Sequence, residues 1–182
     1  MSLTLRLAVP EDLPALRDLM NAAIGELLKP FLPPDGVAAS FDIMGLDSQL
    51  VADGSYFVVE DGGVLAGCGG WSRRATLFGG DHSAGRDAAL LDPSRDAARV
   101  RAMYTHPDHV RKGVGRMILQ ACERAAAGEG FSRCELAATL AGEPLYRACG
   151  YVEIERFSAA TSGGVDVPLV RMGKALPSAP IQ

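Results

Sequence analysis

Residues 102–119 read AMYTHPDHVRKGVGRMIL, and this stretch decides the fold of the chain. We expect a strand over residues 98–105 and a helix from Gly113 to about Ala127, because apolar residues then recur on one helical face. A basic loop with two glycines joins them. Glycine lets a ligand approach the backbone, and the first N–H groups of a helix lack partners and lie at its positive end. The stretch therefore predicts an anion site suited to a phosphate or pyrophosphate.

Two common phosphate-binding motifs do not match this loop. A Walker motif has Ser or Thr after Gly-Lys, whereas here Val114 follows Lys112-Gly113. A dinucleotide fingerprint needs a third glycine, and none is in place after Gly115. ATP and NAD are therefore disfavoured, and a helix start whose glycines only aid packing is the alternative to an anion site.

The rest of the chain predicts a single α/β domain with a mixed sheet. Seven runs have the alternation or the β-branched content typical of strands: residues 3–8, 55–60, 64–72, 98–105, 133–138, 152–157 and 167–172. Four segments are predicted to be helical: residues 13–27, 37–50, 113–127 and 143–149. Asp61-Gly62-Gly63 predicts a hairpin. Residues 74–96 are expected to form a long loop, and such loops are usually functional or disordered.

Composition excludes several classes of protein. The 182 residues carry 18 Lys and Arg against 22 Asp and Glu, a net charge of −4, which disfavours nucleic-acid binding. No run approaches the roughly 18 apolar residues of a membrane span, and MSLTLRLAVPEDL lacks the features of a signal peptide. The four cysteines form no C-x-x-C pair and fit no zinc spacing. We therefore expect a cytoplasmic protein without metal. The 21 glycines are an excess that indicates turns or close backbone approaches.

Two more motifs complete a pattern. PLYRACGY at residues 144–151 places Tyr146 four residues before a Gly-aromatic pair, and LRLA at residues 5–8 precedes Asp12. Together with THP at residues 105–107 and RKGVG at residues 111–115, they give the chain a resemblance to the GNAT acetyltransferase superfamily over roughly residues 3–174. One departure is Val110, where the family often has Gln or Arg.

The resemblance implies an acyl-CoA N-acyltransferase fold over residues 1–175, a mixed central sheet flanked by helices, with a frayed tail at residues 176–182. It implies transfer of acetyl from acetyl-CoA to an amine, by direct attack in a ternary complex. Tyr146 would face the sulfur and act as general acid. The cofactor would be held by backbone groups of two segments: Met103, Tyr104 and Thr105 along the pantetheine arm, and Arg111, Lys112, Gly113, Val114, Gly115 and Arg116 around the pyrophosphate.

The group that takes the proton from the amine is not evident. Glu60 is the tentative base or water relay, and Tyr104, Asp81, His82 and His106 are further candidates. Each also has a simple structural reading, as a turn residue, a packed aromatic, a loop surface or a strand end.

The sequence leaves the function open between two classes of protein, because the same fold would also suit a non-catalytic acyl-CoA-binding module. We expect the acceptor to be a small-molecule or peptide amine. An open groove, rather than a pocket closed by residues 74–96, would indicate that the acceptor is a protein N-terminus or lysine. Residues 71–74 and 77–82 are candidates to flank the acceptor, or are simply packed and solvated. A homodimer is compatible with the sequence.

Overall fold

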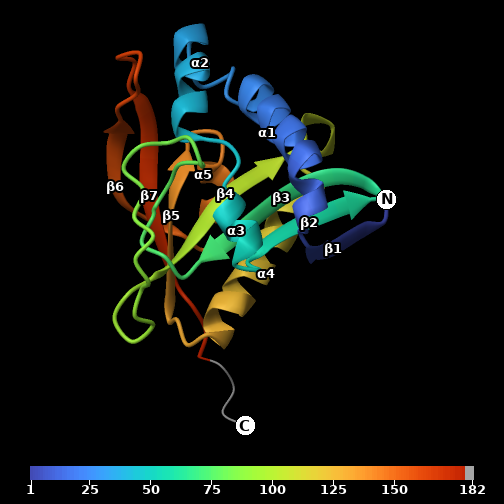
Figure 1. Cartoon of the computed structure of the whole chain (residues 1–182), viewed down its shortest axis with the longest axis vertical. Helices are drawn as coiled ribbons and strands as arrows, with labels where there is room; N and C mark the ends of the chain where they lie inside the picture. Colours follow the sequence, from blue (N-terminus) through green and yellow to red (C-terminus); the bar gives the residue numbers. More distant parts are fainter. Residues whose placement is uncertain (179–182) are drawn as a thin grey trace.

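The structure is a computed structural model that describes residues 1–178. Seven strands form one sheet in the order β1-β2-β3-β4-β5-β7-β6 (Figure 1). The strands are β1 Leu3–Leu7, β2 Tyr56–Asp61, β3 Val64–Ser72, β4 Ala98–Thr105, β5 Arg133–Thr139, β6 Val152–Ala159 and β7 Val167–Ala175. The helices are α1 Leu13–Leu27, α2 Pro34–Ile43, α3 Ser48–Ala52, α4 Val114–Gly128 and α5 Glu143–Ala148, with short 3-10 turns η1 Pro10–Asp12 and η2 Pro107–His109. None of the described helices is long and apolar enough to cross a membrane.

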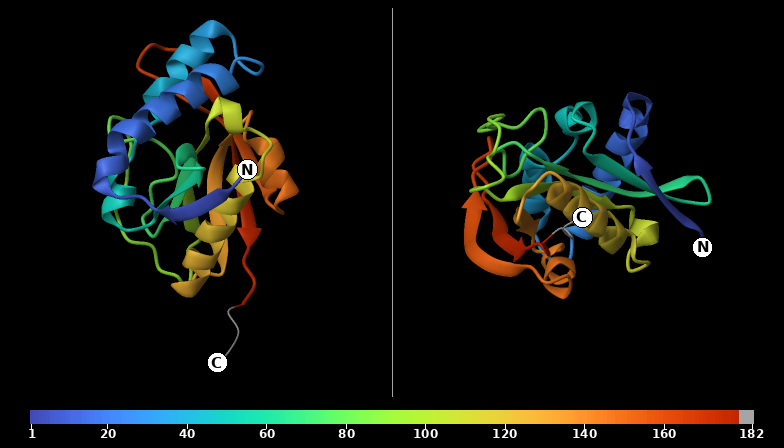
Figure 2. Two further views of the ribbon diagram at one scale, coloured as in Figure 1. Left: turned by 90° about the vertical axis from the view of Figure 1, so that its right-hand side faces the viewer. Right: turned by 90° about the horizontal axis from the view of Figure 1, so that it is seen from below.

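Helices cover both faces of the sheet (Figure 2). Neighbouring residues of β2 point to opposite faces: Val58 packs in the core cluster of α1, and Val59 in that of α4. The α1 cluster contains Leu16, Met20 and Ile24, so the apolar face predicted for this helix is the buried one. The predicted mixed sheet flanked by helices in a single domain is confirmed.

The predicted elements hold except between residues 37 and 50. The sequence predicts one helix there, and this is wrong, because α2 ends at Ile43 and α3 begins at Ser48. Gly45 has a φ of +128°, which no helix allows, and the Asp47 carboxylate caps α3 by accepting a hydrogen bond from the Gln49 N–H at 3.1 Å. The frayed tail also does not begin at Leu176, which is buried and donates its N–H to Ser132 O at 2.8 Å. The end of the tail, residues 179–182, lies outside the described residues.

The β4–β5 gap, the space where these two strands separate, is the feature that makes room for a site. The two parallel strands pair only at Ala98–Cys134 and Arg99–Glu135, although they are eight and seven residues long. A bulge in β4 accompanies the separation, with Ala102 at a φ of +50°. Beyond Arg99 the strands diverge toward the top of Figure 1. The β4 edge that faces β5 therefore has no ladder partner along most of its length.

Glycines in β3 let α4 lie close to the sheet. A Cβ atom at Gly69 would stand 2.9 Å from Cγ2 of Ile118, and one at Gly67 would overlap Val114. Both contacts are too short for real side chains. These glycines therefore make room for the first turns of α4 rather than for a ligand, and they fix where that helix starts relative to β4.

Candidate active site

The basic loop between β4 and α4, the predicted anion site, contains two residues with positive φ. Gly113 is the N-cap of α4 at a φ of +85°, and Arg111 also has a positive φ, of +61°. Such φ values cost little for glycine but more than about 1 kcal/mol for most residues with a side chain. The charged side chains of Arg111, Lys112 and Arg116 are exposed, and Lys112 Nζ donates to Asp108 O at 2.8 Å. Three exposed cationic residues thus lie within three positions of the helix start, where the first N–H groups lack helical partners.

The loop ends beside the β4–β5 gap. A Cβ atom at Gly115 would meet Cδ2 of Leu145 in α5 at 2.7 Å and Oγ1 of Thr105 in β4 at 3.9 Å. The start of α4 therefore lies between the end of β4 and the helix that carries Tyr146. Three segments that are separate in sequence meet at this point.

A cavity of about 100 Å³ occupies the gap. It brings together three of the predicted site residues, Met103, Tyr104 and Tyr146, whereas Thr105 and the loop lie beyond its lining. The rest of its wall comes from both strands and from segments over them: Ile43, Met44, Gly45, Leu77, Phe78, Gly79, Val100, Arg101, Ala102, Leu136, Ala137, Thr139, Gly142 and Leu169.

Tyr146 is the buried residue of α5. Its side chain is buried and packs edge-to-face on Tyr151, with ring centroids 5.9 Å apart. Burial raises the pKa of the Tyr146 hydroxyl above its usual value, since the phenolate would lose solvation. The group that faces the cavity is therefore a neutral hydroxyl at physiological pH.

The bulge in β4 is held by hydroxyl groups that the sequence did not reveal. Tyr56 is fully buried in β2, and its hydroxyl donates to Ala102 O at 2.7 Å. Tyr104 OH accepts the Gly45 N–H at 2.8 Å, and burial raises the pKa of this tyrosine too. The hydrogen bond from Tyr56 thus holds the carbonyl group of the strained Ala102 in place. This in turn sets the direction of the neighbouring N–H groups of β4. Neither role has a signature in the sequence, because a tyrosine in a strand reads as ordinary packing.

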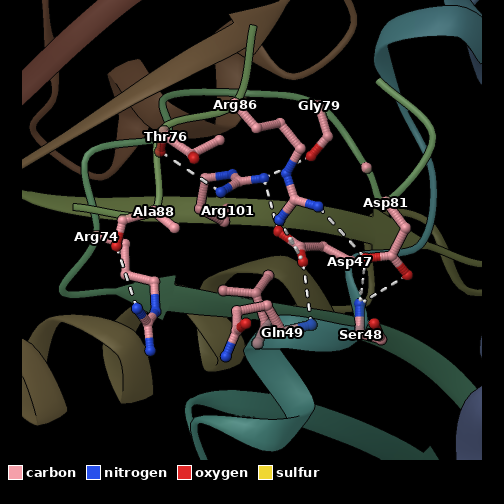
Figure 3. Close-up of polar contacts among 12 residues, drawn as sticks. Asp47, Ser48, Gln49, Arg74, Thr76, Gly79, Asp81, Arg86, Ala88 and Arg101 are labelled. Carbon is pink, nitrogen blue, oxygen red and sulfur yellow. Dashed lines mark hydrogen bonds and ion pairs between the residues drawn. The ribbon is translucent and has the colours of Figure 1, made fainter. Parts of the chain in front are cut away.

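Arg101, which lines the cavity, belongs to a buried ion pair (Figure 3). Arg101 of β4 contacts Asp47, the N-cap of α3, at 2.9 Å, and both side chains are at most 3% exposed. Arg86 adds a second contact to Asp47 at 2.8 Å. Burial lowers the pKa of Arg101, and the nearby Asp47 carboxylate opposes that shift. Arg101 also donates to Thr76 O and Gly79 O, so this pair ties the long loop to the sheet.

Arg101 separates the gap from a second cavity of about 320 Å³ beneath the long loop. The further charged residues of its lining are Arg86, Arg74, Asp47 and Asp81. All of them form ion pairs, Arg74 with Asp53 at 2.8 Å and Arg86 with Asp47 and Asp81. The charges here balance within the protein, and Figure 3 shows the contacts of Arg86 and Arg101 with Asp47.

Of the candidate bases, only Tyr104 lines the cavity. The structure places Glu60 against Arg6 at 2.7 Å and Asp81 against the Ser48 N–H at 3.1 Å. His82 Nε2 lies 2.6 Å from Phe41 O, and His106 Nδ1 accepts the Asp108 N–H at 3.1 Å. Base roles for these residues stay predictions without a supporting contact. Among residues 1–178, no cluster of three or more His, Cys, Asp or Glu side chains is placed to hold a metal ion.

Solved structures show the same fold. A GCN5-related N-acetyltransferase structure from Rhodopseudomonas palustris superposes with a TM-score of 0.71 at 21% identity, covering 97% of each chain. The Salmonella typhimurium protein yncA, solved with its cofactor acetyl-CoA, gives 0.64 at 18% identity, covering 100% of this chain and 98% of that one. The paia N-acetyltransferase of Thermoplasma acidophilum, solved with coenzyme A, gives 0.61 at 14% identity, with 96% and 99% covered. At these identities the likeness shows the fold alone.

The sequence comparisons give the family. No curated protein matches the chain. The family model for the acetyltransferase (GNAT) domain matches residues 52–153, which is more than half of the chain and includes β4, the basic loop, α4 and Tyr146. This chain is a member of the GNAT acetyltransferase family.

Proposed function

We propose that the chain is an N-acetyltransferase that transfers acetyl from acetyl-CoA to a primary amine by direct attack in a ternary complex. One observation carries the proposal: the unpaired edge of β4 and the neutral hydroxyl of Tyr146 meet at one cavity, next to the basic start of α4. A backbone edge, an acid and an anion site are the three groups that this transfer needs.

The described residues suit coenzyme A as a ligand. The pantetheine arm carries amides, which can pair with the free edge of β4 at Met103, Tyr104 and Thr105 as another strand would. The pyrophosphate would be held by N–H groups of residues 111–116, with Arg111, Lys112 and Arg116 supplying charge. The two cofactor-bound structures of the same fold support this assignment.

The chemistry follows from these positions. The amine nitrogen attacks the carbonyl carbon of the thioester, so that a C–N bond forms and the C–S bond breaks. An N–H group of β4 beyond the bulge donates to the oxyanion that develops, and its position is fixed before the reaction by the Tyr56–Ala102 hydrogen bond. Holding both substrates in one cavity removes much of the entropy cost of their encounter.

Two protons must move during the transfer. The departing thiolate takes a proton from the Tyr146 hydroxyl, and the proton released by the amine nitrogen returns through water to the phenolate. No carboxylate or imidazole belongs to the described lining, so the acceptor enters as the neutral amine. The cycle then balances without a dedicated base.

The experiment measures thiol release from acetyl-CoA in the presence of primary amines, for the wild type and Tyr146→Phe. General acid catalysis typically contributes 10²–10⁴-fold, so we expect the variant to lose about 100-fold in kcat with unchanged acetyl-CoA affinity. Tyr151→Phe is the matched control, because it removes the hydroxyl of the neighbouring buried tyrosine outside the cavity. Tight acetyl-CoA binding without thiol release on any amine would instead identify a non-catalytic acyl-CoA-binding module.

A further inference from the structure

One part of the cavity lining, here called the apolar wall, consists of apolar side chains from four separate segments. Met44 follows α2, Leu77 and Phe78 belong to the long loop, and Leu136 and Leu169 lie on β5 and β7. We propose that the acceptor is a primary amine on a small, uncharged, apolar group, an inference that rests on the proposed function of the cavity. Diamines and amino acids would be poor acceptors.

Charge on the cavity wall carries the first part of this inference. Arg101 is the only charged residue of the described lining, and Asp47 neutralises it at 2.9 Å. A second ammonium group in the acceptor would find no carboxylate on the wall, and a carboxylate would find no free cation. Burying an unpaired charge costs far more than burying an apolar group of equal size. The wall therefore selects against both signs of charge.

The size of the cavity carries the second part. Its volume of about 100 Å³ is smaller than the cavity of roughly 150 Å³ that binds benzene in an engineered protein core. It must also contain the acetyl group during the transfer. The cavity therefore has room only for a small acceptor beside the acetyl group.

The apolar wall is fixed in place, so its selectivity does not depend on a mobile loop. Arg101 donates to the carbonyl groups of Thr76 and Gly79, on either side of Leu77 and Phe78 (Figure 3). Phe78 also packs on Phe157 of β6, with ring centroids 5.9 Å apart. Leu77 is half-buried and lies outside the core clusters of the described residues, which makes it suitable for substitution.

The test compares n-butylamine with 1,3-diaminopropane, which has the same number of heavy atoms, and with 3-aminopropanoate. Calorimetry measures the binding of each to the protein saturated with coenzyme A. We expect n-butylamine to bind at least about 10-fold more tightly than the other two, a difference of about 1.4 kcal/mol. Equal or tighter binding of either charged amine, or no measurable binding of n-butylamine, would overturn the inference. Thiol release from acetyl-CoA is measured separately: binding of n-butylamine without release would refute the proposed function and leave the binding preference standing.

A pair of variants tests whether the wall sets the preference. Leu77→Glu adds a carboxylate to the cavity, and Leu77→Gln is its uncharged isostere. We expect the Glu variant to bind 1,3-diaminopropane about 10-fold more tightly than the Gln variant does, with both weaker than wild type for n-butylamine. A gain of affinity cannot arise from misfolding. If the Glu and Gln variants rank the amines in the same order of affinity, Leu77 does not face the acceptor.

Discussion

The proposed cofactor side and the proposed acceptor side of the β4–β5 gap are built in different ways. The cofactor side consists mainly of backbone from one continuous stretch, residues 103–116, in which Gly113 takes a conformation unfavourable for residues with a side chain. The acceptor side consists of side chains from four segments of the chain, joined by the buried pair of Arg101 and Asp47. A phosphate site therefore depends on local conformation, whereas this acceptor site depends on long-range contacts.

The largest expected effect comes from breaking the acceptor side at Asp47. Asp47→Ala leaves Arg101 buried without its partner, and removing one member of a buried pair typically costs about 3–5 kcal/mol. We expect a loss of about that size in the free energy of unfolding, measured by chemical denaturation. In the fraction that stays folded, acetyl-CoA affinity should be unchanged, because no hydrogen bond or ion pair among the described residues joins Arg101 or Asp47 to the side chains of residues 103–116.

Two controls separate the ion pair from the capping role of Asp47. Asp47→Ser retains an N-cap oxygen for α3 but not the charge, so most of the loss should persist. Glu26→Ala removes an exposed pair with Lys29 and should cost less than about 1 kcal/mol. Full stability of the Ser variant would assign the effect to the helix cap.

The next largest effect is expected from a substitution on the proposed cofactor side. Gly113→Asp places a carboxylate where the pyrophosphate is proposed to lie, and like charges about 4 Å apart repel by about 1–4 kcal/mol near a protein surface. We expect acetyl-CoA to bind about 10- to 100-fold more weakly, measured by calorimetry. Gly63→Asp is the matched control, since Gly63 has the same φ of +85° in an open hairpin turn. Normal affinity of the Gly113 variant would place the pyrophosphate elsewhere.

The same contrast explains how much of the molecule could be predicted from the sequence. The positions of the seven strands and of α4 follow from residue periodicity, and the loop from its glycines and cations, because these signals act over a few residues. The break between α2 and α3 does not follow from that periodicity, because the apolar pattern conceals the local signals of Gly45 and the capping Asp47.

The side chains of the proposed acceptor side could not be predicted from short sequence patterns. The sequence favours residues 77–82 equally as acceptor-flanking and as solvated loop, and the structure places Leu77, Phe78 and Gly79 in the lining. Arg101 gives no signal, because a strand arginine is usually solvated, and its partner lies 54 residues away. Glu60 is a candidate base because it lies near a strand end, yet its carboxylate is paired with Arg6. Which side chains meet across the sheet depends on packing that no short pattern encodes.

A smaller effect concerns the bulge where the two sides meet. Tyr56→Phe removes the hydroxyl that holds the Ala102 carbonyl, and a neutral hydrogen bond contributes about 1 kcal/mol. We expect kcat to fall several-fold with little change in acetyl-CoA affinity. The reason is that the N–H groups of β4 would be less well oriented but would stay at nearly the same positions. Steady-state kinetics and calorimetry separate the two quantities. Adding Ala102→Gly removes the cost of the positive φ and should restore part of kcat, since glycine adopts the bulged conformation more easily than alanine does. If the Tyr56 variant weakened acetyl-CoA binding and left kcat unchanged, Tyr56 would act only on the cofactor side.

The smallest expected effect concerns the pH profile, which should have no falling limb below about pH 10. Burial raises the pKa of Tyr146 above its usual value near 10, so the hydroxyl keeps its proton at all lower pH values. With n-butylamine as acceptor, kcat/KM should rise with pH as the neutral amine accumulates, and should not fall again below about pH 10. Tyr146→Phe should give a curve of the same shape at a lower level. A falling limb between about pH 8 and 9.5 in the wild type that is absent from the variant would mean that Tyr146 ionises in that range; it would overturn the raised pKa and leave Tyr146 as the general acid.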